Sequence, residues 1–266
     1  MSPSEHVSFI HNESIISQFT KQAIPYSKRY SVSNENDLMQ LVELTKANGN
    51  DIILDLACGP GIVSCAFAKI VNHVTGIDLT PAMIDQAKIQ QKEKGSTNVT
   101  WKIGDITKKL PFEDNTFSLV VTRYSFHHLL DPMSVLQEME RVCDSESHGR
   151  IAIVDITIEP DKVEAFNQVE RIRDPSHVRA LTFTELKNMM QKAGLTNIKT
   201  GHYKITHQLH EHLQASFPQN PEDLDRLRQI FAEDLGKNKL GLEIHFEEGN
   251  VIHYAIPITI IVGEKI

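Results

Sequence analysis

Short apolar runs alternate with amphipathic segments over the first 156 residues of the chain. The runs have the length and composition of strands buried in a parallel sheet, and they lie at residues 52–56, 73–77, 99–103, 117–122 and 150–156. Helical periodicity is present at residues 37–47, 62–70 and 131–143, and a further helix is expected to begin at Thr80 and Pro81. Because parallel sheets arise from such alternation, the pattern predicts an α/β fold.

Beyond residue 156 the pattern changes. Residues 163–173 predict a helix, Thr182 and Glu185 form a capping box that predicts another, and residues 196–204 predict a strand. Residues 207–240 are polar and are predicted to be helical, and residues 241–262 return to strand character. We therefore expect a seven-stranded sheet with six parallel strands, in which the last strand is antiparallel and lies between the fifth and the sixth.

The amino-acid composition of the chain limits the kinds of molecule that it is expected to bind. The chain has 266 residues, enough for one large α/β domain with a small cap, and its net charge is −8. This excess of acidic residues disfavours a nucleic-acid partner, because proteins that bind nucleic acids gather positive charge on one face. Three cysteines give neither a disulfide framework nor a zinc spacing. The first residues lack the features of a signal peptide, and the apolar run 255–262 is too short to span a membrane, so we expect a cytoplasmic protein without membrane insertion.

A glycine-rich turn follows the first apolar run. Residues 55–61 read Asp-Leu-Ala-Cys-Gly-Pro-Gly, and a helical segment begins at Ile62. A strand, a tight turn and a helix N-terminus together form a corner at which a nucleoside can approach the backbone. A dinucleotide-binding protein would have a third glycine where this chain has Ser64, and the chain has no Tyr-x-x-x-Lys pair. A nicotinamide-dependent oxidoreductase is therefore a remote alternative, and a plain tight turn in some other α/β protein is a second one.

Two further carboxylates follow predicted strands. Asp78 ends the second strand, where a carboxylate can accept hydrogen bonds from both hydroxyls of a ribose. Asp105 follows the third strand, and by itself it could equally be a solvated residue of a strand-end loop.

The acid before the glycine turn, the two later acids and the strand order resemble the class I S-adenosylmethionine-dependent methyltransferases. The turn is similar to motif I of that class, with Ala57 in place of the first glycine. Within the class, the chain resembles the methyltransferase type 11 group, which is related to ubiquinone and menaquinone C-methyltransferases, and the resemblance is close over residues 50–200. Residues 125–129 and 173–179 resemble a bacterial subgroup of small, mostly uncharacterised enzymes. Residues 144–149 depart from the Lys-Pro-Gly-Gly sequence that usually precedes the fifth strand.

The resemblance implies an enzyme with a Rossmann-like class I methyltransferase fold and with S-adenosylmethionine as its cofactor. It implies a single methyltransferase domain over residues 1–266, with a core of about 35–204 and 249–266 and a helical cap from 1–34 and 205–248. We expect Asp55 to hold the amino group of the cofactor, Asp78 its ribose and Asp105 its adenine amine. The residues expected at the cofactor are Asp55, Ala57, Gly59, Gly61, Asp78, Leu79, Met83, Gly104, Asp105, Ile106 and Arg123.

Candidate catalytic residues follow the fourth strand, because ligands of open parallel sheets lie outside the carboxyl ends of the strands. His127 and His128 are candidate bases for an oxygen or activated carbon acceptor, although one of them could be a structural histidine. His177 is the third candidate, in a segment whose Asp-Pro-Ser-His sequence is also typical of a plain turn. The candidate substrate-binding residues are Tyr26, Tyr124 and Arg179. The histidines at 202, 207, 210 and 212 are expected to be solvated, so no metal site is predicted.

The sequence thus predicts transfer of a methyl group to oxygen, nitrogen or carbon of a small molecule in a capped pocket. The absence of an Asn/Asp-Pro-Pro-Tyr stretch argues against the enzymes that methylate amino groups of DNA or protein glutamine. A non-catalytic or non-methylating protein that binds S-adenosylmethionine is the alternative. The acceptor, the pathway and the oligomeric state do not follow from the sequence.

Overall fold

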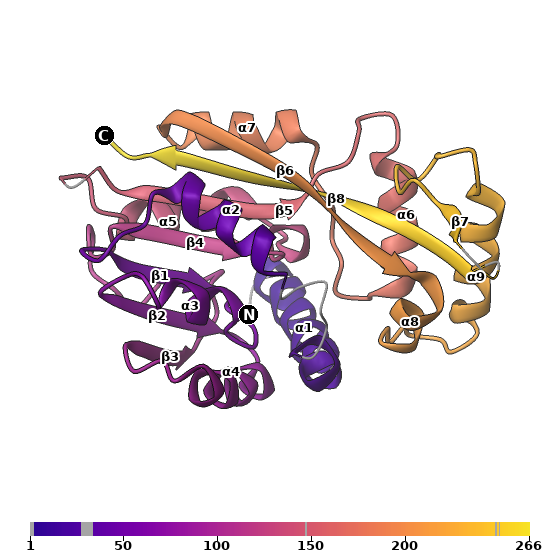
Figure 1. The fold of residues 1–266 in the computed structure, drawn as a ribbon, viewed down its shortest axis with the longest axis horizontal. Helices are drawn as coiled ribbons and strands as arrows, with labels where there is room; N and C mark the ends of the chain where they lie inside the picture. Colours follow the sequence, from indigo (N-terminus) through magenta and orange to yellow (C-terminus); the bar gives the residue numbers. More distant parts are fainter. Residues whose placement is uncertain (1–2, 28–33, 147, 248, 250) are drawn as a thin grey trace.

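The computed structural model describes residues 3–27, 34–146, 148–247, 249 and 251–266. In that part of the chain, eight strands form one sheet, and seven of them follow the order β3-β2-β1-β4-β5-β8-β6 (Figure 1). Strands β1 to β5 are parallel, and β8 is antiparallel to both β5 and β6. The strands are β1 (Ile52–Leu56), β2 (His73–Asp78), β3 (Val99–Ile103), β4 (Leu119–Arg123), β5 (Arg150–Ile156), β6 (Thr196–Gln208), β7 (His245–Glu247) and β8 (Val251–Glu264). The predicted seven-stranded order is confirmed, and β7 adds a short strand that pairs with β8.

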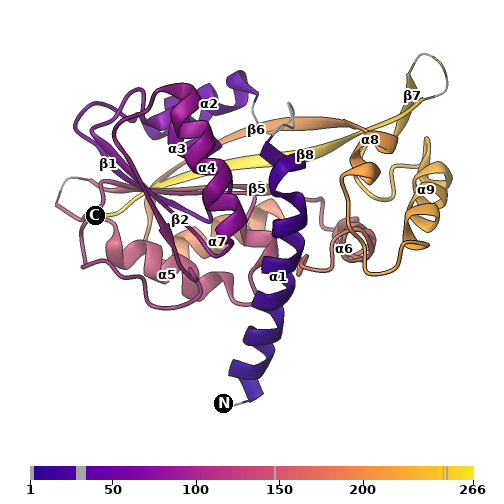
Figure 2. The ribbon, with the colours of Figure 1, turned by 90° about the horizontal axis from the view of Figure 1, so that it is seen from below.

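Helices cover both faces of the sheet. Figure 2 shows α2, α3 and α4 on one face and α5 and α7 on the other. Their bounds are α2 (Glu35–Thr45), α3 (Ile62–Phe67), α4 (Pro81–Lys94), α5 (Pro132–Val142) and α7 (Phe183–Lys192). The predicted capping box is confirmed at α7, where the side chains of Thr182 and Glu185 each bond the other's backbone N–H. The expected helix at 62–70 is wrong in its end, because α3 stops at Phe67.

The core lies on the two faces of the central strands. Consecutive residues of β4 point to opposite faces, so that Leu119 and Val121 pack toward α2 and α3 while Val120 packs toward α5 and α7. All three side chains are fully buried. This burial on both sides explains why the central parallel strands are continuous apolar runs rather than alternating patterns.

The long strands β6 and β8 extend beyond the other strands into a second lobe (Figure 1). Three helices lie in this lobe, α6 (Val163–Arg173), α8 (Leu209–Gln214) and α9 (Asp223–Asp234). The predicted end of the sixth strand at residue 204 is wrong, because the strand continues to Gln208, which pairs with His253. The expected helical segment 207–240 therefore begins in a strand and is then divided into α8 and α9. Pairing with β8 overrides the weak local preference of these polar residues.

Helix α1 (Pro3–Ser27) crosses the space beyond the carboxyl ends of the parallel strands and contacts α4 (Figures 1 and 2). It belongs to the first segment of the predicted cap, and α8, α9 and β7 belong to the second. Residues 1–2, 28–33 and 248 of that predicted cap lie outside the described residues. Among the helices that are described, none is long and apolar enough to cross a membrane.

Candidate functional site

The turn after β1 adopts the backbone that the glycine motif requires. Ala57, Gly59 and Gly61 all have positive φ angles, of 52°, 52° and 78°. Ala57 takes a left-handed conformation that glycine adopts at lower cost, which is consistent with a glycine at this position in the resembling motif. A side chain at Gly61 would begin only 2.6 Å from the ring of Trp101. The turn is therefore pressed closely against β3 at the start of α3.

Asp55 lies at the end of β1 with its carboxylate buried. Ser64 donates a hydrogen bond from Oγ to Oδ2 of Asp55 over 2.5 Å. Burial raises the pKa of Asp55 to about 7, although the Ser64 hydroxyl and the Arg123 guanidinium act against that rise. A ligand that brings a positive charge to this carboxylate would stabilise its ionised form.

Asp78 connects the end of β2 to the glycine turn. Its Oδ2 accepts from the N–H of Gly59 and its Oδ1 accepts from the N–H of Thr80, each over 2.8 Å. Burial raises the pKa of this carboxyl group above its ordinary value, while these two N–H groups lower it. The carboxylate is thus held rigidly at the edge of the turn.

Asp105 connects the loop after β3 to helix α1. Its Oδ2 accepts a hydrogen bond from Nδ2 of Asn12 over 2.8 Å, and its Oδ1 accepts from the backbone and hydroxyl of Thr107. A second bond from the same helix runs from Nε2 of His11 to the carbonyl of His128 over 2.7 Å. Helix α1 is therefore attached to both sides of the space above the strand ends.

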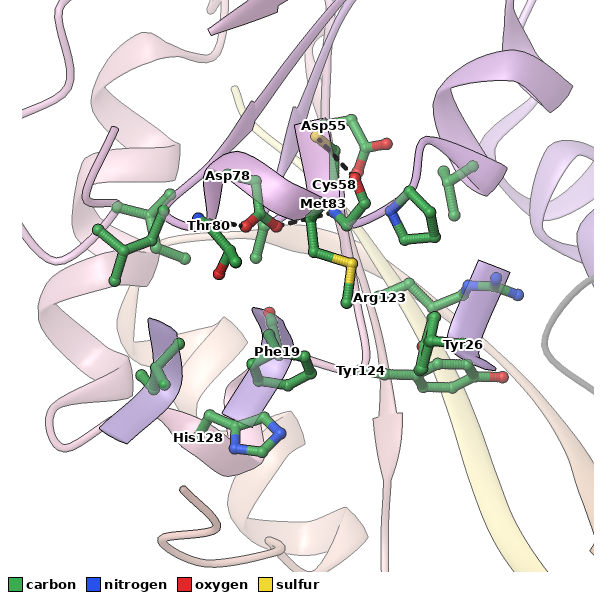
Figure 3. A pocket seen from close by; sticks show the side chains of 18 of the residues that line it. Phe19, Tyr26, Asp55, Cys58, Asp78, Thr80, Met83, Arg123, Tyr124 and His128 are labelled. Carbon is green, nitrogen blue, oxygen red and sulfur yellow. Dashed lines mark hydrogen bonds between the residues drawn. The ribbon is translucent and has the colours of Figure 1, made fainter. Parts of the chain in front are cut away.

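A cavity of about 100 Å³, hereafter the first cavity, lies between α1 and the strand ends. In Figure 3, Asp55, Asp78 and Met83 lie on one side of it, and Phe19 and His128 lie on the other. The sequence-predicted residues that line it are Tyr26, Asp55, Ala57, Gly59, Asp78, Leu79, Met83, Asp105, Ile106, Arg123, Tyr124 and His128. Gly61 and Gly104 are not among the lining residues, although their chain neighbours Pro60, Ile62 and Asp105 are.

Arg123 and Tyr124 end β4 at the wall of the first cavity. The Arg123 guanidinium lies 4.7 Å from the centre of the Tyr124 ring, a cation–π arrangement. The Tyr124 hydroxyl is hydrogen-bonded to that of Tyr203 on β6 over 2.6 Å. Tyr124 has a φ of 59°, which costs energy for a side chain of this size. Two elements thus hold this ring in place at the strand end.

A second cavity of about 90 Å³ lies beside the first. The two share Phe19, Tyr26, Tyr124 and His128, so these side chains form the wall between them. The second cavity is also lined by His127, by isoleucines of β5, β6 and β8, and by charged residues at the end of α6. Glu170 and Arg173 form an ion pair there, with an N–O distance of 2.6 Å.

His127 and His128 lie side by side after β4, with ring centres 4.2 Å apart. Nδ1 of His127 bonds Oδ1 of Asp155 over 2.5 Å, and Nδ1 of His128 donates to the carbonyl of Ser176 over 2.9 Å. Asp155 was not predicted as a site residue. Its signal in the sequence was a single carboxylate inside the apolar fifth strand.

His177 and Arg179 line neither cavity. The His177 ring is buried and turned toward Asn167, whose Oδ1 accepts from Nε2 over 2.8 Å. Arg179 is half-exposed at the start of α7 and forms an ion pair with Glu185. Their predicted roles at the substrate therefore gain no support from position, because each side chain is held by a partner away from the cavities.

The prediction that the histidines of β6 and α8 are solvated is wrong for two of them. His207 and His212 are buried, and their rings stack at 4.3 Å between centres. Tyr254 on β8 stacks on His212 and bonds its Nδ1 through the hydroxyl. Among the residues whose placement is described, no group of three or more His, Cys, Asp or Glu could hold a metal ion.

Comparison with known proteins identifies the class. A family model described as a methyltransferase domain matches residues 47–234. The uncharacterized methyltransferase YcgJ of Bacillus subtilis is 32% identical over 173 residues, which are 64% of this chain and 67% of that protein. Its crystal structure superposes with a TM-score of 0.78 at 24% identity and covers 87% of this chain and 99% of its own. The chain belongs to the methyltransferase family.

One further relative and one further solved structure are also similar to this chain. The ubiquinone/menaquinone biosynthesis C-methyltransferase UbiE of Bdellovibrio bacteriovorus is 30% identical over 149 residues, which are 54% of this chain and 62% of that enzyme. Phosphoethanolamine N-methyltransferase 2 of Haemonchus contortus, solved with S-adenosylmethionine, shares the fold with a TM-score of 0.60 at 17% identity, covering 86% of this chain and 52% of its own. The protein is an S-adenosylmethionine-dependent methyltransferase, as the sequence predicted.

Proposed function

We propose that the protein transfers a methyl group from S-adenosylmethionine in the first cavity to a small molecule in the second cavity. The observation that carries the proposal is the shared wall of Phe19, Tyr26, Tyr124 and His128. Because both cavities are lined by these four side chains, a ligand in one would lie next to a ligand in the other. The apolar isoleucine lining and the net charge of −8 favour a small molecule over a nucleic acid.

The residues of the first cavity fit the polar groups of the cofactor. Asp55, Asp78 and Asp105 are three carboxylates at the ends of three adjacent strands, and the cofactor carries three groups that donate hydrogen bonds. We assign the amino group to Asp55, the ribose hydroxyls to Asp78 and the adenine amine to Asp105. Leu79, Met83 and Ile106 supply apolar contact for the adenine ring, and we assign the carboxylate of the cofactor to Arg123, which also lines the cavity. The positive φ angles of Ala57, Gly59 and Gly61 form a tight turn that the ligand can approach closely.

The protein's part in the reaction is mainly alignment. Bound S-adenosylmethionine supplies a methyl group on a positively charged sulfur. Holding the acceptor in line with that methyl group is worth an effective molarity of about 10⁵–10⁸ M. Tyr124 and Phe19 fix the geometry of the wall, and α1 excludes water from above through its bonds to Asp105 and His128.

The proposal is tested with a variant whose larger side chain fills the second cavity and leaves the first intact. Ile205 is a buried lining residue of the second cavity only, so Ile205→Trp should leave calorimetric binding of S-adenosylmethionine within about twofold of wild type. We expect the same variant to lose transfer of a labelled methyl group to the small-molecule fraction of a cell extract. Ile89→Trp, at a half-exposed position on α4, is the matched control and should keep both properties.

The other outcomes have defined meanings. Label recovered in protein or nucleic acid instead of small molecules would contradict the proposed acceptor class. Cofactor binding without any labelled product would favour a non-methylating protein that binds S-adenosylmethionine.

A further inference from the structure

A carboxylate and an imidazole meet at the base of the second cavity. His127 follows β4 in a short 3₁₀ turn, and Asp155 lies on the neighbouring strand β5. Besides its 2.5 Å bond to the ring, Asp155 accepts from the backbone N–H of His127 over 3.2 Å and from that of Ile156 over 2.7 Å. Both side chains are more than 90% buried. This carboxylate is therefore fixed by three contacts and in turn fixes the orientation of the ring.

The bond to Asp155 determines which nitrogen of His127 faces a ligand. A carboxylate oxygen accepts, so Nδ1 carries the proton in this bond and a neutral ring has its lone pair on Nε2. Among the residues that the structure describes, none makes a hydrogen bond to Nε2, and His127 lines the second cavity. The ring is thus arranged to take a proton from a molecule bound there.

The surrounding groups raise the pKa of His127 and lower that of the neighbouring His128. The groups that face it are Asp155 on β5, Glu170 on α6, Asp174 after α6, and the rings of His128 and His177. Burial alone would lower the pKa of His127, but the carboxylates outweigh burial and raise it. Burial and the charge of His127 lower the pKa of His128 to about 4. At neutral pH, His128 therefore stays uncharged beside a histidine that readily holds a proton.

We propose that His127 and Asp155 form a proton-accepting pair, and that the methyl acceptor is a compound with an ionisable hydroxyl group, such as a phenol or an enol. This inference rests on the proposed function of the second cavity. The hydroxyl proton passes to Nε2 of His127, and the resulting oxyanion lies beside an imidazolium that Asp155 stabilises. An electron pair of the oxyanion, or of the carbon conjugated to it, forms the bond to the methyl carbon. The bond between that carbon and sulfur breaks with its pair left on sulfur, which gives S-adenosylhomocysteine.

An amine acceptor fits this arrangement poorly. An amine attacks in its neutral form and need not lose a proton before the transfer, so a positioned base adds little to its reactivity. A hydroxyl group is a weak nucleophile until its proton leaves, so it is the acceptor that benefits from a positioned base. Asp155 acts through His127 and is a positioning residue.

The test uses acceptors that differ in acidity but little in shape. Wild type and Asp155→Asn are assayed with phenol, 4-nitrophenol and aniline, and with enols and their matched amines, by release of S-adenosylhomocysteine. We expect Asp155→Asn to slow transfer to the weakly acidic hydroxyl compounds by about 100-fold or more. Its effect on 4-nitrophenol, which solvent already ionises, should be less than about tenfold, and cofactor affinity should not change. A purely structural defect would reduce both rates alike. Asp161→Asn, at an exposed position, is the matched control.

Other results overturn the inference. Equal losses on both phenols, turnover of amines alone, or no turnover of any hydroxyl compound by protein that binds the cofactor would each do so. Turnover of an amine that Ile205→Trp abolishes would still support the proposed function, whereas the absence of any labelled small molecule from the cell extract would contradict both. If Asp155→Asn does not fold, ¹⁵N NMR titration of the wild-type histidines decides the matter. It should show His127 protonated on Nδ1 and titrating above His128, and the reverse order would overturn the proposal.

Discussion

The side-chain amide of Asn12 donates to Oδ2 of Asp105 over 2.8 Å, and this bond joins α1 to the loop after β3. The two residues are 93 positions apart in the chain. Because Asp105 is also the carboxylate that we assign to the adenine amine, α1 and the cofactor meet at the same side chain. The N-terminal helix therefore covers the first cavity by a contact that cofactor binding would change.

We expect Asn12→Ala to speed both the entry and the release of S-adenosylmethionine. Loss of one hydrogen bond worth about 0.5–1.5 kcal/mol predicts a release rate about two to twelve times that of wild type. Trp101, the single tryptophan of the chain, lies against the glycine turn and provides the fluorescence signal for stopped-flow measurement. Ser17→Ala, on the exposed side of the same helix, should release the cofactor at the wild-type rate. An unchanged release rate in Asn12→Ala would show that this bond does not restrain the helix.

The raised pKa of Asp55 predicts how the affinity for the cofactor depends on pH. Its pKa of about 7 means that the carboxyl group is largely protonated below neutrality and ionised above it. If Asp55 holds the positively charged amino group, the dissociation constant should rise by up to about tenfold for each pH unit below 7 and level off above it. Calorimetry with S-adenosylhomocysteine over this range measures the effect. Asp55→Asn should bind weakly, with no such pH dependence, and a wild-type affinity that is constant across pH 7 would contradict the assignment.

The raised pKa of Asp55 has the opposite effect on folding: it makes the folded protein more stable at low pH, whereas it weakens cofactor binding there. A carboxyl group whose pKa is raised in the folded state holds more protons there than in the unfolded chain, between about pH 4 and 7. The contribution of Asp55 to stability is therefore fully present at low pH and is lost as the pH rises through its folded pKa. Urea unfolding of the free protein and of Asp55→Asn at these two pH values separates this contribution from that of other groups.

The strands and the three strand-end acids could be predicted because their signals are local. Apolar runs mark the central parallel strands, and Asp55, Asp78 and Asp105 lie at or close to the ends of β1, β2 and β3. The fold follows from the alternation of these runs with helical segments. The capping box at Thr182 is equally local, since both of its partners lie within one turn.

The contacts that complete the site could not be predicted, because they join distant segments. Asn12 meets Asp105, Tyr124 meets Tyr203 and His127 meets Asp155 only once the sheet has formed. The predicted end of β6 was wrong for the same reason, because its last polar residues adopt strand conformation by pairing with β8. The burial of His207 likewise depends on Tyr254 across that pair. Sequence patterns of one segment carry no information on such partners.

The close packing around Gly76 on β2 leaves no room for a side chain at this position next to the site. A methyl group at this position would lie 2.5 and 2.7 Å from the ring of Trp101 and 3.0 Å from Sγ of Cys58. Gly76→Ala should therefore lower the free energy of unfolding by about 1–3 kcal/mol, as overpacking of a core does. Urea unfolding measures it, and Gly49→Ala, where the nearest atom is 3.8 Å away, is the matched control with little expected change. Equal stability of the two variants would mean that Trp101 moves aside without cost.

The hydrogen bonds of Thr182 predict how much the N-terminal cap of α7 contributes to the stability of the fold. Its hydroxyl accepts from the N–H of Glu185, and the Glu185 carboxylate accepts from the N–H and the hydroxyl of Thr182. Removing the hydroxyl leaves the N–H of Glu185 without its acceptor, so Thr182→Ala should lower the free energy of unfolding by about 0.5–2 kcal/mol. Thr184→Ala, an exposed substitution of the same type two residues on, should change it by less than about 0.5 kcal/mol. Because α7 packs on β8 away from both cavities, cofactor affinity should be unchanged in both variants. A loss of affinity that accompanies the loss of stability would instead mean that the cap of α7 also maintains the strand ends.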